Sequence, residues 1–477
     1  KPWAGLALTF ELAGNACRHP SPLLAEGQER LLQPLLGREP RFRAALAAYR
    51  REHCGGRHRV TEDYVRRFAQ TGPRVGVSVY SALERAPLPP LQGAKVGSGP
   101  VARTRHLGTP FRPAPGVNLF GFHRSPIGLG HLSRGLHTAL AGTGLPVRPN
   151  VLGNVAMDAD LGPGDFVRVY DHGLDTNLFV SYPHLHDLLL AALPEHVVRD
   201  RRNVVYLAWE QRDGSHYWPE VYAGFEQVWA LSKFAAESLE RSLERQVAIV
   251  PCVLDTAAFP PPAAKGEVGL DPARFTFLYI FDANSSIERK NPEAVIRAFA
   301  AAFSPGEPVQ LVLRVANAWR PDHRERLRRL LRTAPRGLDL ALVLEEMPHR
   351  DLLRLLSAAD CYVSLHRAEG FGYTCAEAMA YGKPVIATGY SGNLQFMHRE
   401  NSYLVDYEER EVGTADGPFQ RGSVWAEPSA EHAAHLMRSV YRDPLAAAEV
   451  GRCGRCDVLR QLSVTAVGRI AADALGR

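Results

Sequence analysis

Short apolar runs alternate with helical stretches along the chain after residue 115. Runs rich in Val, Leu, Phe and Tyr occupy residues 117–122, 203–209 and 227–231, and each is followed by apolar positions at helical spacing. Continuous apolar runs are typical of parallel strands, because helices bury both faces of such a sheet. The alternation therefore predicts an α/β fold.

A Pro-rich segment, PCVLDTAAFPPPAAKG at 251–266, divides the alternation into two series. The second series contains the apolar runs FTFLYIF, VQLVLRV, LALVLE, CYVSL and PVIAT. We predict two doubly wound, Rossmann-like domains facing a cleft, at 115–262 and 263–477, with C-terminal helices closing the second. Open α/β sheets bind ligands at the carboxyl ends of their strands, so chemistry is expected in the loops there.

The first 114 residues differ from the rest. Segments 26–49 and 62–70 have helical apolar spacing, and a Pro/Gly-rich stretch follows at 86–100. This pattern predicts a helical and loop extension that ends in a linker. The extension contains no chemical motif, and its role does not follow from the sequence.

The composition of the chain is that of a globular protein. Of 477 residues, 45% are hydrophobic and 22% charged, as in soluble globular proteins. No apolar run approaches the ~20 residues of a spanning helix, and no export leader opens the chain. Seven cysteines, an odd and small number, suit a reducing compartment, so we expect a cytoplasmic protein. The lone C-x-x-C at Cys453 and Cys456 cannot complete a tetrahedral zinc site by itself.

Charge excludes one class of partner. The net charge is +5, without a block of five like charges, whereas a nucleic-acid binder concentrates positive charge on one face. Only six of the 56 basic residues are lysines, so an anion site should consist mainly of guanidinium groups. The mildly basic surface is also compatible with peripheral contact at a membrane.

The strongest chemical pattern is AEGFGYTCAEAMAYGKPVIAT at 368–388. Glu369 is predicted in a loop after a strand, and Glu377 about one turn into the following helix. Gly370 and Gly372 allow backbone amides to approach an anion, and the helix N-terminus favours phosphate. A helix carboxylate can accept hydrogen bonds from a ribose diol.

A second pattern, FDANSSIERKNPEAVIRAF at 281–299, follows the first strand of the second series. Arg289 and Lys290 precede a helix that we expect to start near Asn291, with Pro292 at an early position. Cations are mildly unfavourable at a helix start, which favours a functional role for the pair. Arg can hold a phosphate bidentately and Lys can hold it as a point charge, so the pair suits an anionic ligand.

A strand, a Gly-rich turn and a helix follow one another in VNLFGFHRSPIGLGHLSRGL at 117–136. Gly128 and Gly130 would allow backbone to lie near a phosphate or sugar, although a lone G-x-G more often marks a simple tight turn. For His131 and Arg134, on the following helix, surface roles and ligand roles are equally expected.

Two further groups of residues remain open. Trp209 and Glu210 end a strand: Glu210 could orient a hydroxyl, and Trp209 could stack on a sugar or simply pack. His172, after another strand, competes for the role near the hydroxyl. Asp158 and Asp160 form a D-A-D that could hold a divalent metal, but two carboxylates in a turn are usually solvated.

The spacing E-G-F-G-x-x-x-x-E, followed by A-x-A-x-G-x-P-V-I-A-T, resembles the nucleotide-sugar motif of retaining GT-B glycosyltransferases of the family 4 type (glycosyl transferases group 1). The resemblance implies that Glu377 holds the donor ribose and that Glu369 lies beside the transferred sugar. It also implies that the intervening loop lines the donor site, through Phe371, Gly372, Tyr373 and Thr374.

The same resemblance implies a basic pair for the donor pyrophosphate. The family commonly has an Arg directly after the strand, where this chain has Asn284, Ser285 and Ser286. We therefore expect Arg289 to replace that Arg beside Lys290, and Asn284 to lie on the donor side. Many relatives also have a His near the position of Glu210.

Together with these patterns, the resemblance implies a hexosyltransferase that moves a sugar from a nucleoside diphosphate-sugar to an acceptor hydroxyl with retention. The basic pair would make a metal unnecessary, and no cofactor is expected. The acceptor would be a glycan, a lipid-linked sugar or a small molecule, bound by the first domain. Two alternatives stay open: another GT-B sugar-nucleotide enzyme, such as an epimerase or a phosphorylase, and a non-catalytic protein that binds nucleotide-sugars or glycans.

Overall fold

The computed structural model describes residues 113–123, 125, 127–151, 173–183, 195–198, 201–214, 218–318, 321–332, 334–413 and 422–477. The predicted extension at 1–114 lies outside this part of the chain, apart from its last two residues. Asp158, Asp160 and His172 also lie outside it.

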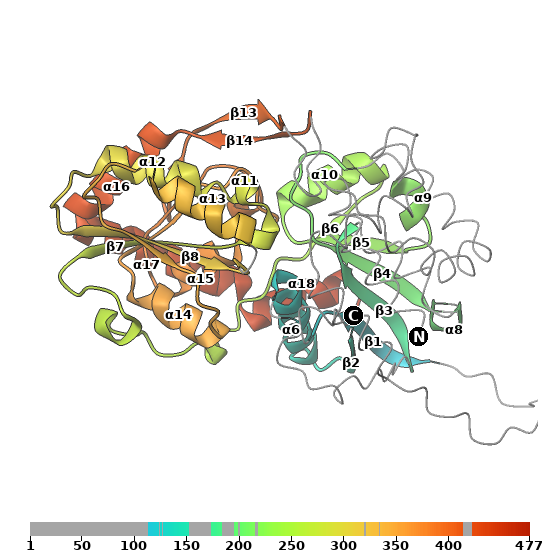
Figure 1. The fold of residues 1–477 in the computed structure, drawn as a ribbon. Helices are drawn as coiled ribbons and strands as arrows, with labels where there is room; N and C mark the ends of the chain where they lie inside the picture. The colour runs from blue at the N-terminus through green and yellow to red at the C-terminus, as the bar shows by residue number, and fades with distance from the viewer. Residues whose placement is uncertain are drawn as a thin grey trace, which may run out of the picture. The chain divides into compact units, whose positions relative to one another are not determined.

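The first sheet has six strands in the order β2-β1-β3-β4-β5-β6 (Figure 1). They are β1 (Ala114–Gly121), β2 (Val147–Val151), β3 (Leu174–Ser181), β4 (Arg202–Leu207), β5 (Gln227–Ala230) and β6 (Ala248–Ile249). Buried Asn118 fastens β1 to β3, because its amide donates to Leu174 O and to Asn177 Oδ1, both at 2.9 Å. The strand predicted to end at Trp209 ends two residues earlier, at Leu207.

The second sheet also has six strands, in the order β12-β11-β10-β7-β8-β9. They are β7 (Phe275–Asp282), β8 (Val309–Ala316), β9 (Leu340–Val343), β10 (Cys361–Ser364), β11 (Val385–Thr388) and β12 (Tyr403–Val405), and all neighbours pair in parallel. The strand order reverses between β7 and β10, as in doubly wound dinucleotide-binding folds. The predicted fold class, two parallel α/β sheets, is confirmed.

Helices of the second sheet begin where the sequence predicts. Figure 1 shows α12 (Pro292–Ala302) and α13 (Pro321–Arg332) on one side of β7 and β8, and α14 (His349–Ala358) and α15 (Tyr373–Ala380) on the other. Asn291 caps α12 by accepting from Ala294 N, and Pro292 takes the first helical position, where no N–H is needed.

The remaining elements are shorter or lie near the C-terminus. They are α6 (Gly128–Ala141), α8 (Glu195–Val198), α9 (Trp218–Tyr222), α10 (Lys233–Leu243), α11 (Ile287–Lys290), the hairpin β13 (Tyr407–Glu411) and β14 (Val424–Pro428), α16 (Ala430–Arg442), α17 (Pro444–Leu462) and α18 (Val464–Ala474). α18 packs against α6, and a Cβ at Gly468 would lie 2.5 Å from Ala139 O. None of the helices in the described ranges combines the length and hydropathy that a bilayer crossing requires.

Contacts divide the chain into two compact units. The second unit contains 128–145, 205–223 and everything from 227 onward, and so holds all the candidate site residues that the structure describes. The boundaries that the sequence suggests, at 114 and 262, stay a prediction.

Candidate functional site

The point where the second sheet reverses its strand order brings two predicted loops together. β7 leads to Lys290, the last residue of α11, and β10 leads to Glu369 in the loop before α15. The ammonium of Lys290 forms an ion pair with Oε1 of Glu369, and Arg289 Nη1 lies 3.3 Å from Oε2. The side chains of Lys290 and Glu369 are only 16% and 14% exposed, so the pair is shielded from water.

Glu369 is a carboxylate at neutral pH. Burial opposes its ionisation, but the charges of Lys290 and Arg289 outweigh burial and lower the pKa of Glu369 to about 2. An ionised carboxylate only accepts hydrogen bonds. Glu369 can therefore balance positive charge or orient hydroxyl groups, but it cannot act as a proton-donating acid at neutral pH.

Arg289 is more deeply buried than its neighbour. Its guanidinium donates to Ser285 O from Nε and Nη2, at 3.3 and 3.0 Å, and to Ala368 O from Nη1, at 2.8 Å. Its Nε also lies 3.9 Å from a carboxylate oxygen of Glu210. Arg289 thus connects α11 to the loop that carries Glu369, and it brings Glu210 into the same charged group.

The backbone around Glu369 is fixed by the loop after β11. Glu369 N donates to Ser391 Oγ, and Gly392 N donates to Glu369 O, both at 2.8 Å. A Cβ at Gly392 would lie 1.9 Å from Gly370 O, so only glycine fits there. Ser391 and Gly392 were not among the predicted site residues, although their place in the loop after the PVIAT strand is a usable signal.

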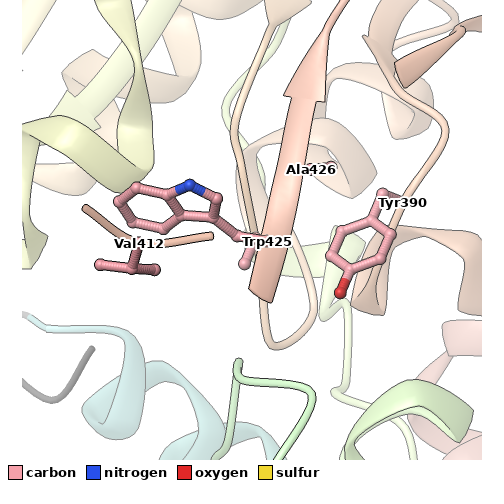
Figure 2. Packing of buried hydrophobic residues seen from close by; sticks show 5 residues of the cluster. Tyr390, Val412, Trp425 and Ala426 are labelled. Carbon is pink, nitrogen blue, oxygen red and sulfur yellow. The ribbon is translucent and has the colours of Figure 1, made fainter. Parts of the chain in front are cut away.

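The hairpin β13–β14 holds the chain just before Glu369. Figure 2 shows Trp425 beside Val412; these two residues form a buried cluster with Ala368, Tyr390 and Ala426. Ala426 N donates to Arg367 O at 3.0 Å, and the guanidinium of Arg367 lies 5.2 Å from the centre of the Trp425 ring. No pattern in the sequence predicts this support.

Glu377 lies one turn into α15, as predicted. Gly372 caps the helix with φ +89°, a conformation that favours glycine. The Glu377 side chain is 6% exposed, and its Oε1 lies 2.8 Å from Nε2 of His349. His349, the first residue of α14, was not among the predicted site residues, although it too follows a strand of this sheet.

A second imidazole packs against His349. The ring of His131, on α6, lies 4.2 Å from that of His349 and 6.0 Å from that of Tyr373, centre to centre. Burial, then the neighbouring His349 and Arg134, lower the pKa of His131 to about 3. His131 is therefore neutral at physiological pH.

Other predicted residues of the donor loop have structural partners. The Phe371 side chain is buried against Phe396, with ring centres 5.0 Å apart. Thr374 Oγ1 accepts a hydrogen bond from Tyr362 OH at 2.7 Å. The Phe371 ring and the Thr374 hydroxyl are thus engaged in contacts within the protein.

The remaining predicted residues lie at three places. Asn284, in a 3₁₀ turn after β7, is exposed, and its backbone N donates to Asp282 Oδ1 at 2.8 Å. Gly128 begins α6, where a Cβ would meet open space, and Gly130 is buried within the helix. The structure does not test their predicted contacts with the donor.

Trp209 packs in the protein interior. It is 3% exposed, its indole N–H donates to Ser238 Oγ at 3.1 Å, and its ring meets Trp218 edge-on at 4.7 Å. Of the two interpretations, packing is therefore the one that the structure supports.

Cys453 and Cys456 are free and exposed on α17, and within the described ranges no three His, Cys, Asp or Glu side chains form a metal-binding group.

Two six-stranded parallel α/β sheets are the architecture of the GT-B class of fold. Residues 276–455 match the family model described as Glycosyl transferases group 1. The predicted resemblance to this group is confirmed.

Individual relatives are distant. The chain is 26% identical over 212 residues to D-inositol 3-phosphate glycosyltransferase of Pseudarthrobacter chlorophenolicus, a match that covers 43% of this chain and 44% of that protein. Among solved structures, it resembles sucrose-phosphate synthase of Thermosynechococcus elongatus with a TM-score of 0.56 at 18% identity, covering 76% of this chain and 98% of the other. It also resembles HepE of Anabaena, solved in complex with UDP and glucose, with a TM-score of 0.54 at 14% identity, covering 76% and 99%.

Proposed function

We propose that the protein is a retaining glycosyltransferase that moves a sugar from a nucleoside diphosphate-sugar to an acceptor hydroxyl. The observation that carries the proposal is the contact between Lys290 and Glu369 at the strand-order reversal of the second sheet. Ligands of doubly wound sheets bind at such points. A half-buried lysine beside a half-buried carboxylate offers positive charge for a diphosphate and an acceptor for sugar hydroxyls in one place.

The leaving diphosphate would be stabilised by charge. An ammonium has three N–H donors, and Glu369 occupies one side of Lys290, so the group can still donate to phosphate oxygens. The free N–H groups at the start of α15 would add to this stabilisation, while Arg289 contributes its charge from its buried position. A divalent metal is then not required.

Each carboxylate would have its own role. Glu377 would accept from the ribose diol of the donor, and Glu369 would position the transferred sugar. Glu210, joined to the group through Arg289, would orient an acceptor or sugar hydroxyl. Among the residues that the structure describes, no enzyme nucleophile is evident. Retention would therefore follow from attack on the leaving-group face, with the leaving phosphate assisting deprotonation.

The donor and acceptor are proposed only as classes. The HepE structure contains UDP and glucose, so UDP-hexoses are the first donors to test. The acceptor would be a glycan, a lipid-linked sugar or a small molecule, met in the cytoplasm or at a membrane surface.

Donor hydrolysis tests the proposal. Purified protein is incubated with UDP-, GDP- and ADP-hexoses, and release of the nucleoside diphosphate is followed with and without a panel of sugar acceptors. We expect slow release from one donor by the wild-type protein and none by Glu377→Ala. If the wild-type protein neither binds nor hydrolyses any donor, the proposal is wrong.

The same preparation separates the alternatives. An absorbance band of pyridoxal phosphate would identify a phosphorylase of the cofactor-dependent type. Donor binding without any turnover would identify a binding protein, and inversion at a sugar carbon without transfer would identify an epimerase.

A further inference from the structure

Three side chains from three helices form a row that ends at the proposed ribose ligand. His131 of α6 packs on His349 of α14, and Nε2 of His349 lies 2.8 Å from Oε1 of Glu377 on α15. Glu377 is almost fully buried, whereas the His349 side chain is 37% exposed. The exposed member of the row is therefore His349, and the carboxylate at its end is buried beside it.

The hydrogen bond fixes a torsion that is otherwise loose. The terminal torsion of a glutamate side chain is broad and roughly two-fold, so an unsupported carboxylate samples many orientations. Donation from His349 to Oε1 sets the plane of the group. A carboxylate has about four acceptor sites, so one lone pair of Oε1 and both of Oε2 remain for a ligand.

His131 makes this arrangement rigid. Because its pKa is lowered to about 3, its ring is uncharged and packs on His349 without repelling it. Together the His131 ring on one side and the carboxylate on the other restrict how the His349 ring can turn.

We propose that His349 is a positioning residue that orients Glu377 for the vicinal diol of a nucleotide ribose. The inference rests on the proposed function, and it adds a residue that neither the motif nor its spacing identifies. His349 acts through the carboxylate, so its contribution depends on the ribose hydroxyls of the ligand.

Two variants separate the effect of the His349 hydrogen bond from the effect of its aromatic ring. His349→Phe keeps an aromatic ring against His131 but cannot donate to Glu377. His349→Gln keeps an N–H donor near the position of Nε2. The exposed side chain makes both variants compatible with folding, which thermal melting checks directly.

Calorimetric titration provides the test. The probe is whichever of UDP, GDP and ADP binds the wild-type protein most tightly, together with its 2′,3′-dideoxy form, which lacks both hydroxyls of the diol. We expect His349→Phe to weaken binding of the ribonucleotide about tenfold, the size of one hydrogen bond to a charged group, and binding of the 2′,3′-dideoxy form less than twofold. His349→Gln should bind the ribonucleotide within about threefold of wild type.

Every other result overturns the inference. Equal losses of affinity for the two nucleotides would mean that His349 does not act through the ribose. No loss of affinity would mean that Glu377 needs no support from His349. Failure of His349→Gln to restore binding would exclude the donor role. If the wild-type protein binds none of the three nucleotides, the proposed function fails as well, which distinguishes that failure from the others.

Discussion

Lys290 and Glu369 are in contact although 79 positions separate them in the chain. The topology of the sheet explains the contact, because β7 and β10 are neighbours and the loops that follow them leave from the same edge. Each loop resembles a solvated turn by itself. Placed together, they form a shielded ion pair that a diphosphate-sugar would have to engage.

Removing the ammonium tests its role in leaving-group stabilisation. Lys290→Ala should lower kcat/KM for donor turnover. The loss should correspond to a rise of about 2 to 4 kcal/mol in activation free energy, the size of one lost electrostatic donor. The measurement is steady-state release of nucleoside diphosphate. Lys233→Ala is the matched control, because its side chain is 76% exposed and pairs only within its own helix in the described contacts. Equal rates for the two variants would remove Lys290 from the site.

The two carboxylates should differ in kinetics. Glu377→Gln should mainly raise the KM for the donor, by about tenfold, because it weakens acceptance from the ribose in ground state and transition state alike. Glu369→Gln should mainly lower kcat, because under the proposed function this carboxylate positions the reacting sugar. Initial rates at varied donor and acceptor concentrations separate the two effects. A change confined to the KM for the acceptor would contradict the ribose role of Glu377.

The charge of Glu369 should appear in the pH dependence of stability. Its pKa is about 2 in the folded protein, below the ~4.3 of an unfolded glutamate, so its stabilising contribution is present above about pH 5 and lost as the pH falls towards 2. Between pH 6 and pH 3, the free energy of unfolding of the wild-type protein should fall by about 2 kcal/mol more than that of Glu369→Gln. Urea unfolding at several pH values measures the difference. Glu307, whose pKa is also lowered to about 2, is present in both proteins and cancels.

A parallel loss of stability in the two proteins would show that Glu369 is not held as a carboxylate by its basic neighbours. That result would also weaken the argument for Lys290, since both depend on the same ion pair.

Much of this fold follows from local sequence. The apolar run of β7 and the pair Asn291–Pro292 identify a buried strand and a capped helix, because strand burial and helix capping depend on neighbouring residues. The spacing of Glu369 and Glu377 likewise identifies a loop and a helix position. These features need no knowledge of the rest of the chain.

The supporting contacts could not be predicted in this way. The hydrogen bond from His349 to Glu377 joins elements 28 positions apart, and its existence depends on which strands are neighbours. The same is true of the Ala426–Arg367 hydrogen bond. The role of Trp209 could not be predicted for a different reason. A tryptophan at a strand end can either stack on a sugar or pack in the core, and only its burial distinguishes the two.

Chelation tests the metal-independent mechanism. If Lys290, Arg289 and the start of α15 neutralise the leaving diphosphate, excess EDTA should leave the rate of donor turnover within about twofold of the untreated rate. Added Mg²⁺ after dialysis is the control for a tightly held ion. Complete loss of activity, restored by the metal, would instead favour the D-A-D at Asp158 and Asp160.

The last prediction concerns the hairpin that supports the Glu369 loop. Trp425→Ala removes a buried indole that packs against Ala368 and the guanidinium of Arg367, so the free energy of unfolding should fall by about 3 kcal/mol. Under conditions where the variant stays folded, kcat should also fall, because the chain before Glu369 loses its support. Urea unfolding and donor turnover measure the two effects. Leu445→Ala, at a side chain 83% exposed, should change stability by less than about 0.5 kcal/mol. Normal kcat in a destabilised Trp425→Ala protein would mean that the hairpin supports the fold without positioning Glu369.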